Sequence, residues 1–120
     1  MKTLDLVLKH KWFDMIASGE KKDEYREVRP YWTKRFLNMC PGCRLKAEGD
    51  FCLRNCSILK VNRCIAVNFD KVRFHRGYTG VTVTCEVRCV YIGFGVPRWG
   101  AEPSMPYYVI RLGKQLSKTM

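Results

Sequence analysis

The sequence predicts an α+β fold that is mainly β, a small antiparallel β-barrel with two short helices and a cysteine-rich insert. Short segments in which apolar and polar residues alternate recur along the chain, whereas two segments near the N-terminus have helical spacing. Residues 39–63 lack apolar periodicity, contain four cysteines and interrupt this pattern. A chain of 120 residues suffices for one hydrophobic core but not for two, so we expect one domain, residues 1–120.

The N-terminal part should contain a strand, a helix, an extended segment and a second helix. Residues 3–8 carry leucine at every second position, which predicts a half-buried strand. Apolar side chains at helical spacing predict a helix over residues 10–18, and Gly19 follows as its C-terminal stop. After the extended segment, Pro30 fits the opening position of a second helix over residues 30–38.

The extended segment between the helices concentrates charge. Residues 19–26 contain six charged side chains. Glu24 and Arg26 share one face of a strand there, because side chains alternate with a period of two. Lys21 has the opposite parity, but from the turn before the strand its side chain can still reach the same cleft. The alternative interpretation is a solvated edge strand with alternating charges.

This segment resembles a known signature. Read as Gly-x-Lys-x-x-Glu-x-Arg, positions 19, 21, 24 and 26 are similar to the motif of the ASCH domain family, small β-barrels with a PUA-like fold that are generally supposed to handle RNA. The resemblance, to a phage and bacterial branch, covers most of the chain apart from roughly residues 39–64. The similar segments are Leu4 to Leu8, Lys11 to Ile16, Arg29 to Trp32, Trp99-Gly100 and Tyr108 to Ile110. It implies a PUA-like barrel with an RNA partner.

The insert over residues 39–63 is expected to bind zinc. Its cysteines have the spacing Cys-x2-Cys-x8-Cys-x3-Cys and are Cys40, Cys43, Cys52 and Cys56. A segment with so few apolar groups cannot offset its ordering entropy by burial, whereas four thiolates around one structural Zn²⁺ can stabilise it directly. The alternatives are a reactive dithiol at the first cysteine pair and four thiols without a metal.

Three strands are expected after the insert. Residues 65–74 alternate with a break in the middle, and residues 81–92 alternate most clearly. The predicted inner face of the latter comprises Val81, Val83, Cys85, Val87, Cys89 and Tyr91. This parity makes its two cysteines core residues and not metal ligands. Residues 107–112 should close the sheet, and no order is expected from Gly113 onward.

A long loop precedes the last strand. Residues 93–106 contain three glycines and three prolines, and ordered loops of this length commonly carry function. Arg98 beside Trp99 offers a cation and a stacking plane, which single-stranded nucleic acid can use. The alternative is that Trp99 plugs one end of the barrel.

The charge balance favours a polyanionic partner. The chain has 22 Lys and Arg against 11 Asp and Glu, a formal net charge of +11, and a pI of about 9.6. The C-terminal half is the more basic, since residues 71–120 hold eight basic and two acidic side chains. No apolar run approaches the roughly 20 residues that span a bilayer, and no signal peptide is recognisable. We therefore expect a cytoplasmic protein, whose seven cysteines favour thiols or metal ligands over a disulfide framework.

The leading functional hypothesis is a nucleic-acid-binding module, most naturally for RNA. In it Lys21, Arg26 and Arg98 contact phosphates or base edges, Trp99 stacks on a base, and Glu24 orients Arg26. No phosphate-binding loop, His-Glu-x-x-His motif or nucleophile elbow is present in the sequence.

Two alternatives stand beside it. Some members similar to the ASCH family hydrolyse acylated cytidines, and the resemblance implies a catalytic lysine, a threonine and a glutamate. The lysine is retained as Lys21, whereas Glu24 stands in place of the threonine. In this alternative, Lys21 and Glu24 would act as the acid–base pair in hydrolysis of acylated cytidine or RNA. The other alternative is an accessory protein that binds a partner protein through the insert.

Overall fold

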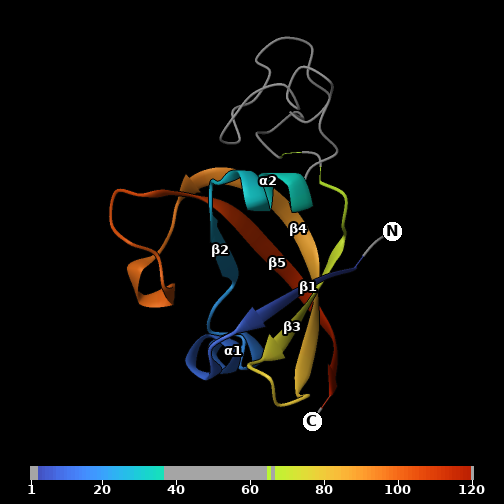
Figure 1. Ribbon diagram of the computed structural model, residues 1–120. Coiled ribbons are helices and arrows are strands. Elements are labelled where there is room, and N and C mark those ends of the chain that lie inside the picture. Colours follow the sequence, from blue (N-terminus) through green and yellow to red (C-terminus); the bar gives the residue numbers. More distant parts are fainter. Residues whose placement is uncertain (1–2, 37–64, 66, 120) are drawn as a thin grey trace.

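The fold is described from a computed structural model, which describes residues 3–36, 65 and 67–119 (Figure 1). In chain order its elements are β1 (Thr3–Leu8), α1 (His10–Ala17), β2 (Asp23–Glu27), α2 (Pro30–Phe36), β3 (Lys71–Arg76), β4 (Thr82–Phe94), the 3₁₀ helix η2 (Pro97–Trp99) and β5 (Pro106–Thr119). The expected α+β, mainly β character with two short helices is confirmed. In this part of the chain, neither helix is long and apolar enough to cross a membrane.

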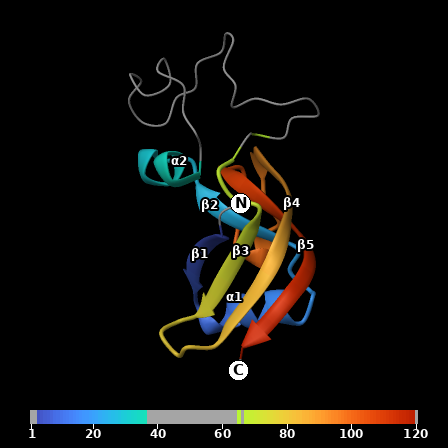
Figure 2. The ribbon, with the colours of Figure 1, turned by 90° about the vertical axis from the view of Figure 1, so that its right-hand side faces the viewer.

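The five strands form one curled sheet in the order β1-β3-β4-β5-β2. β1 runs parallel to β3, and the other neighbouring strands are antiparallel. The two views in Figure 1 and Figure 2 show α1 at one end of this sheet and α2 at the other. The sheet is a half-barrel in place of the closed barrel expected from the sequence, because β1 and β2 form its two edges.

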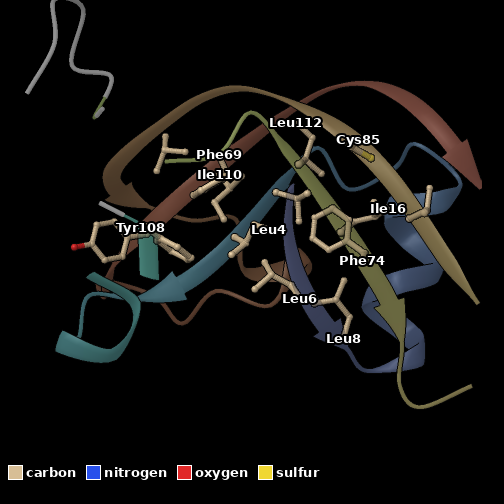
Figure 3. Packing of buried hydrophobic residues seen from close by; sticks show 14 of the residues in the cluster. Leu4, Leu6, Leu8, Ile16, Phe69, Phe74, Cys85, Tyr108, Ile110 and Leu112 are labelled. Carbon is tan, nitrogen blue, oxygen red and sulfur yellow. The ribbon is translucent and has the colours of Figure 1, made fainter. Parts of the chain in front are cut away.

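Alternating leucines build one end of the core, as predicted for β1. Leu4, Leu6 and Leu8 are buried, and Figure 3 shows them inside the curled sheet together with Phe74 of β3 and Ile16 of α1. The apolar side of α1 therefore covers this end, and its polar side faces solvent.

The other end of the core is closed by α2. Phe36 is fully buried, and its ring contacts the rings of Trp32, Phe69 and Tyr108. The hydroxyl groups of Thr33 and Tyr108 are hydrogen-bonded at 2.5 Å, which satisfies two polar groups inside this apolar layer. Burial raises the pKa of Tyr108, so its phenol stays neutral.

The buried face of β4 changes along the strand. Val83 and Cys85 are buried as predicted, but further along the strand Val90 is buried and Cys89 is only half-buried. The pairing of β4 with β5 contains register shifts on both sides of Cys85, and an extra residue on a strand turns the following side chains to the opposite face. The prediction that Cys89 and Tyr91 continue the inner face is therefore wrong. Cys89 is disulfide-bonded, and Tyr91 packs on the outer face.

The last strand is longer than the sequence predicts. Residues 113–119 continue β5 and pair with the first part of β4, with Ser117 opposite Thr84 and Lys118 opposite Val83. The expectation of a tail without order is wrong, because backbone pairing with a partly buried neighbouring strand needs no apolar alternation in the tail itself. The strand expected over residues 65–74 is also displaced, since β3 covers only Lys71–Arg76.

A second, smaller apolar cluster lies on the outer face of β2 and β5. It consists of Tyr25, Ala101, Tyr107 and Val109, with Tyr91, Trp99 and Met105 packed against it. The loop that contains η2 approaches Tyr25 of β2 closely at Gly95, where a Cβ would lie 2.8 Å from ring carbon Cε1 of Tyr25. The backbone N–H of Val96 donates to the Tyr25 hydroxyl at 2.9 Å. These contacts hold the loop, and with it Trp99, beside β2.

Candidate functional site

The C-terminal end of α1 positions Lys21. Gly19 adopts a positive φ of 86°, which lets the chain leave the helix, and the backbone N–H of Lys21 then donates to the carbonyl oxygen of Met15 at 2.9 Å. Because β2 begins only at Asp23, the two-residue period does not apply to Lys21. Its side chain consequently reaches Glu24 from the turn before β2, as the sequence analysis expected.

Glu24 lies between two cations. One carboxylate oxygen, Oε1, is 2.6 Å from Nζ of Lys21, and the other, Oε2, is 2.8 Å from Nη2 of Arg26. The side chains of Lys21 and Glu24 are 3% and 5% exposed, whereas that of Arg26 is 19% exposed. The buried core of the site is therefore an ion pair, and Arg26 extends it toward solvent.

Aromatic rings surround both cations. Nζ of Lys21 lies 5.2 Å from the ring centroid of Trp12 and 5.7 Å from that of Tyr25. The guanidinium carbon of Arg26 lies 4.9 Å from the ring centroid of Trp32. Such cation–π contacts hold the charged groups in place where little water remains to solvate them.

The signature cleft, as we name the hollow above this group, lies along the free edges of β1 and β2 and has a volume of about 280 Å³. Its lining residues are Val7, Leu8, Lys9, Trp12, Lys21, Glu24, Tyr25, Arg26, Trp99 and Gly100. The incomplete closure of the sheet thus creates the cleft, and Arg26 bridges the gap with a contact of 3.5 Å from Nη2 to the carbonyl oxygen of Val7.

Two donors in the walls of the signature cleft lack acceptors. Nε of Arg26 and Nε1 of Trp99 are buried and have no hydrogen-bond partner among the described residues. A buried donor without an acceptor costs about 1–3 kcal/mol. Among the described residues, the carboxylate of Glu24 is the only one that lines the cleft, and it already accepts from two cations. Both unpartnered nitrogens are closed to solvent, so the cleft presents to a ligand mainly its aromatic rings and the part of the Arg26 side chain that is exposed.

Four of the predicted binding or catalytic residues come together here, and one does not. Lys21, Glu24, Arg26 and Trp99 all line the signature cleft. Arg98 is exposed outside it, with its guanidinium carbon 5.6 Å from the Trp99 ring centroid. Trp99 lines the cleft and packs against the outer cluster, which is separate from the core inside the curled sheet.

The predicted metal ligands Cys40, Cys43, Cys52 and Cys56 lie outside the described residues. Over residues 3–36, 65 and 67–119, no group of three or more His, Cys, Asp or Glu side chains is arranged to hold a metal ion. Cys85 is a buried free thiol, and burial raises its pKa to about 11. It is therefore protonated at neutral pH, which agrees with the core position predicted for it.

Basic residues of β3 are neutralised by acids of the N-terminal elements. Asp5 lies 2.9 Å from Nε2 of His75 and 3.3 Å from Nη1 of Arg73. Asp14 accepts from Arg76, and this hydrogen bond lowers the pKa of Asp14. The basic surplus of the C-terminal half therefore does not lie along β3.

Sequence reasoning missed two aromatic residues of the signature cleft. Trp12 entered the sequence analysis only through the predicted helix over residues 10–18, and Tyr25 has the opposite parity to Glu24. Both line the cleft because it runs along the free edge of β2, where residues from either face can reach it. One sequence signal could have identified Tyr25 as a residue of the cleft, because it is a large aromatic residue next to a charged residue of the signature.

Comparison with protein-family models, with curated proteins and with solved structures found no match for this chain.

Proposed function

We propose that the protein binds single-stranded nucleic acid, in particular RNA, and that the signature cleft receives one unstacked nucleotide. The observation that carries this proposal is the convergence of Lys21, Arg26 and Trp99 on one cleft. Membership of the ASCH family, which the signature suggested, would fit the same proposal.

The chemistry of the cleft favours a nucleotide over a purely apolar ligand. Trp12, Tyr25 and Trp99 offer ring surface on which a base can stack. The partly exposed guanidinium of Arg26 suits carbonyl or phosphate oxygens. The volume of about 280 Å³ lies near the lower limit of small-molecule pockets, which suits one nucleotide and not a duplex. A net charge of +11 would add the salt-dependent attraction that nucleic-acid binding shows.

Arg26→Ala is expected to weaken binding of a single-stranded RNA dodecamer about 10- to 150-fold, because a hydrogen bond to a charged group contributes about 1.5–3 kcal/mol. The matched control is Arg73→Ala, which removes the same side chain from an exposed ion pair with Asp5, where neither residue lines the signature cleft. Fluorescence anisotropy at several salt concentrations gives both affinities. Equal losses in the two variants would refute a role for the signature cleft.

A second candidate function is hydrolysis of an acylated cytidine, and the Lys21–Glu24 pair favours it. Its separation of 2.6 Å in a buried site suits proton transfer between the two groups. In such a reaction water adds to the acyl carbon and gives one proton to Glu24, the carbon–nitrogen bond breaks, and the lysine ammonium supplies the proton that the leaving amine needs. The proton on Glu24 then passes to Lys21, which restores both groups.

Incubation with N4-acylated cytidines tests this second function through release of the carboxylic acid. We expect no turnover from the wild-type protein, because the threonine implied by the hydrolytic relatives is replaced by Glu24. Turnover that is present in the wild type and lost in Lys21→Met would establish the hydrolase and displace the binding module as the main function.

A further inference from the structure

A second hollow lies on the other side of Lys21, between the C-terminal end of α1 and the irregular part of the β4–β5 ladder. Its volume is about 520 Å³. Lys22, Arg88 and Lys114 line it, together with one carboxylate, that of Glu86. We name it the basic hollow. Because these three cations outnumber the one carboxylate, the surface of the hollow is electropositive.

The cations of the basic hollow are available to a ligand. Among the described residues, Lys22, Arg88 and Lys114 form no ion pair, although Arg73, Arg76 and Arg111 of the same sheet each pair with a carboxylate. All three are exposed, so a ligand does not have to displace a buried partner. Exposed cations without partners attract phosphate groups with little desolvation cost.

The backbone of β5 makes room for one of these cations. A Cβ on Gly113 would lie 2.9 Å from Cγ of Arg88 and 3.4 Å from the Cβ of Glu86. Only a residue without a side chain therefore lets the stem of Arg88 lie across β5 in its present position. Gly113 stands where the register of β4 against β5 shifts, so the irregular pairing and the placement of Arg88 belong to one local feature.

Lys21 connects this surface with the signature cleft. It lines both hollows, with its ammonium group bound to Glu24. The two hollows are therefore adjacent at this side chain. A strand that leaves the signature cleft past Lys21 would enter the basic hollow next.

We propose that the basic hollow binds backbone phosphates of the single-stranded nucleic acid whose base occupies the signature cleft. This inference rests on the proposed function and extends it, because it assigns a path to the strand on one side of the cleft. Two lysines and one arginine suit phosphate oxygens that are read without regard to base sequence. The base then contacts the aromatic cleft, and the phosphates contact the hollow.

The test uses two double variants that each remove two lysines. Lys22→Ala/Lys114→Ala changes the basic hollow, and Lys34→Ala/Lys118→Ala removes two exposed lysines outside both hollows. Each phosphate contact on a single strand contributes about 0.7 to the slope of log affinity against log salt. Loss of two contacts should lower that slope by about 1.4. A variant that binds RNA as tightly as the wild type at 1 M salt would then bind it about 25-fold more weakly than the wild type at 0.1 M salt. The control should change it much less, and equal changes in the two variants would overturn the inference.

Pyrophosphate, followed by NMR, separates failure of this inference from failure of the proposed function. We expect it to shift amide signals of residues 86–88 and 112–115 in the wild type and not in Lys22→Ala/Lys114→Ala. These shifts without any RNA binding would support an anion site and reject the nucleic-acid function. RNA binding that depends on Arg26, with no shifts from either pyrophosphate or RNA in these residues, would reject the basic hollow alone.

Gly113→Ala provides an independent variant that keeps every charge. Its methyl group should displace the side chain of Arg88, so the salt slope for RNA should fall by about 0.7, the contribution of one phosphate contact. Thermal unfolding establishes that the variant is folded at the assay temperature. A folded Gly113→Ala protein with an unchanged salt slope would contradict the role of Arg88.

Discussion

Glu24→Gln is expected to lower the free energy of unfolding by about 3–5 kcal/mol, the range observed when one partner of a buried ion pair is removed. The two oxygens of Glu24 each accept from a different cation, Lys21 and Arg26. A glutamine has one acceptor oxygen and one donor nitrogen, so its amide group must face one of these cations with a donor. That cation would remain largely buried without a partner.

The same substitution at Glu27 is the matched control. Glu27 lies on the same strand and pairs with Arg29, but the two side chains are 42% and 68% exposed. Exposed ion pairs contribute about 0.2–1 kcal/mol, so Glu27→Gln should have a small effect. Urea unfolding followed by circular dichroism measures both variants. A loss at Glu24 no larger than at Glu27 would mean that water solvates the Lys21–Glu24 pair.

A double variant tests whether the unpartnered cation causes the loss. Lys21→Met keeps most of the lysine's length and removes its charge, and its thioether can pack against the rings of Trp12 and Tyr25. Lys21→Met/Glu24→Gln should therefore be more stable than Glu24→Gln alone, because the glutamine oxygen can then serve Arg26. A double variant less stable than both single variants would show that the loss has another origin.

This stability difference bears on function. A buried ion pair often stabilises a protein no more than apolar packing would. Stability alone is therefore a weak reason for three charged residues in β2 and the turn before it. Here the pair lines a cleft, and Glu24 holds Arg26 with part of its side chain exposed at that cleft. The charged group is therefore better understood as preorganisation for a ligand than as part of the core.

Local patterns were sufficient to predict the elements near the N-terminus. The leucines of β1, the glycine after α1 and the proline that opens α2 act through neighbouring residues, so their spacing alone identifies strand, turn and helix. The contact between Glu24 and Arg26 follows from the same local period. These features need no knowledge of what packs against them.

Features that depend on strand pairing were not predictable in this way. The register shifts beside Cys85 reverse the side chains of β4, and no pattern within β4 marks them. Residues 113–119 form a strand only because β4 supplies the hydrogen-bonding partner. The signature cleft combines β1, α1, β2 and the loop around Trp99, which are distant in sequence. Its residues were found through a signature, whereas Trp12 and Tyr25 required the fold.

Trp99→Ala is expected to weaken binding of single-stranded RNA about 5- to 150-fold, because stacking of one base on an aromatic ring contributes about 1–3 kcal/mol. The indole lines the signature cleft. Loss of the side chain therefore removes a stacking surface. Phe94→Ala is the matched control, since it removes an aromatic ring that is 69% exposed at the end of β4.

Trp99 also packs against the outer apolar cluster, so the assay must separate binding from folding. Trp99→Phe keeps a ring in this position and removes only the indole nitrogen and part of the surface. Its affinity should lie between those of the wild type and Trp99→Ala when all variants are compared well below their melting temperatures. If Trp99→Ala binds RNA as tightly as Phe94→Ala does, Trp99 serves only to fix the loop against Tyr25 and Tyr107. The proposed stacking of a base in the signature cleft would then be wrong, whatever the contribution of Arg26.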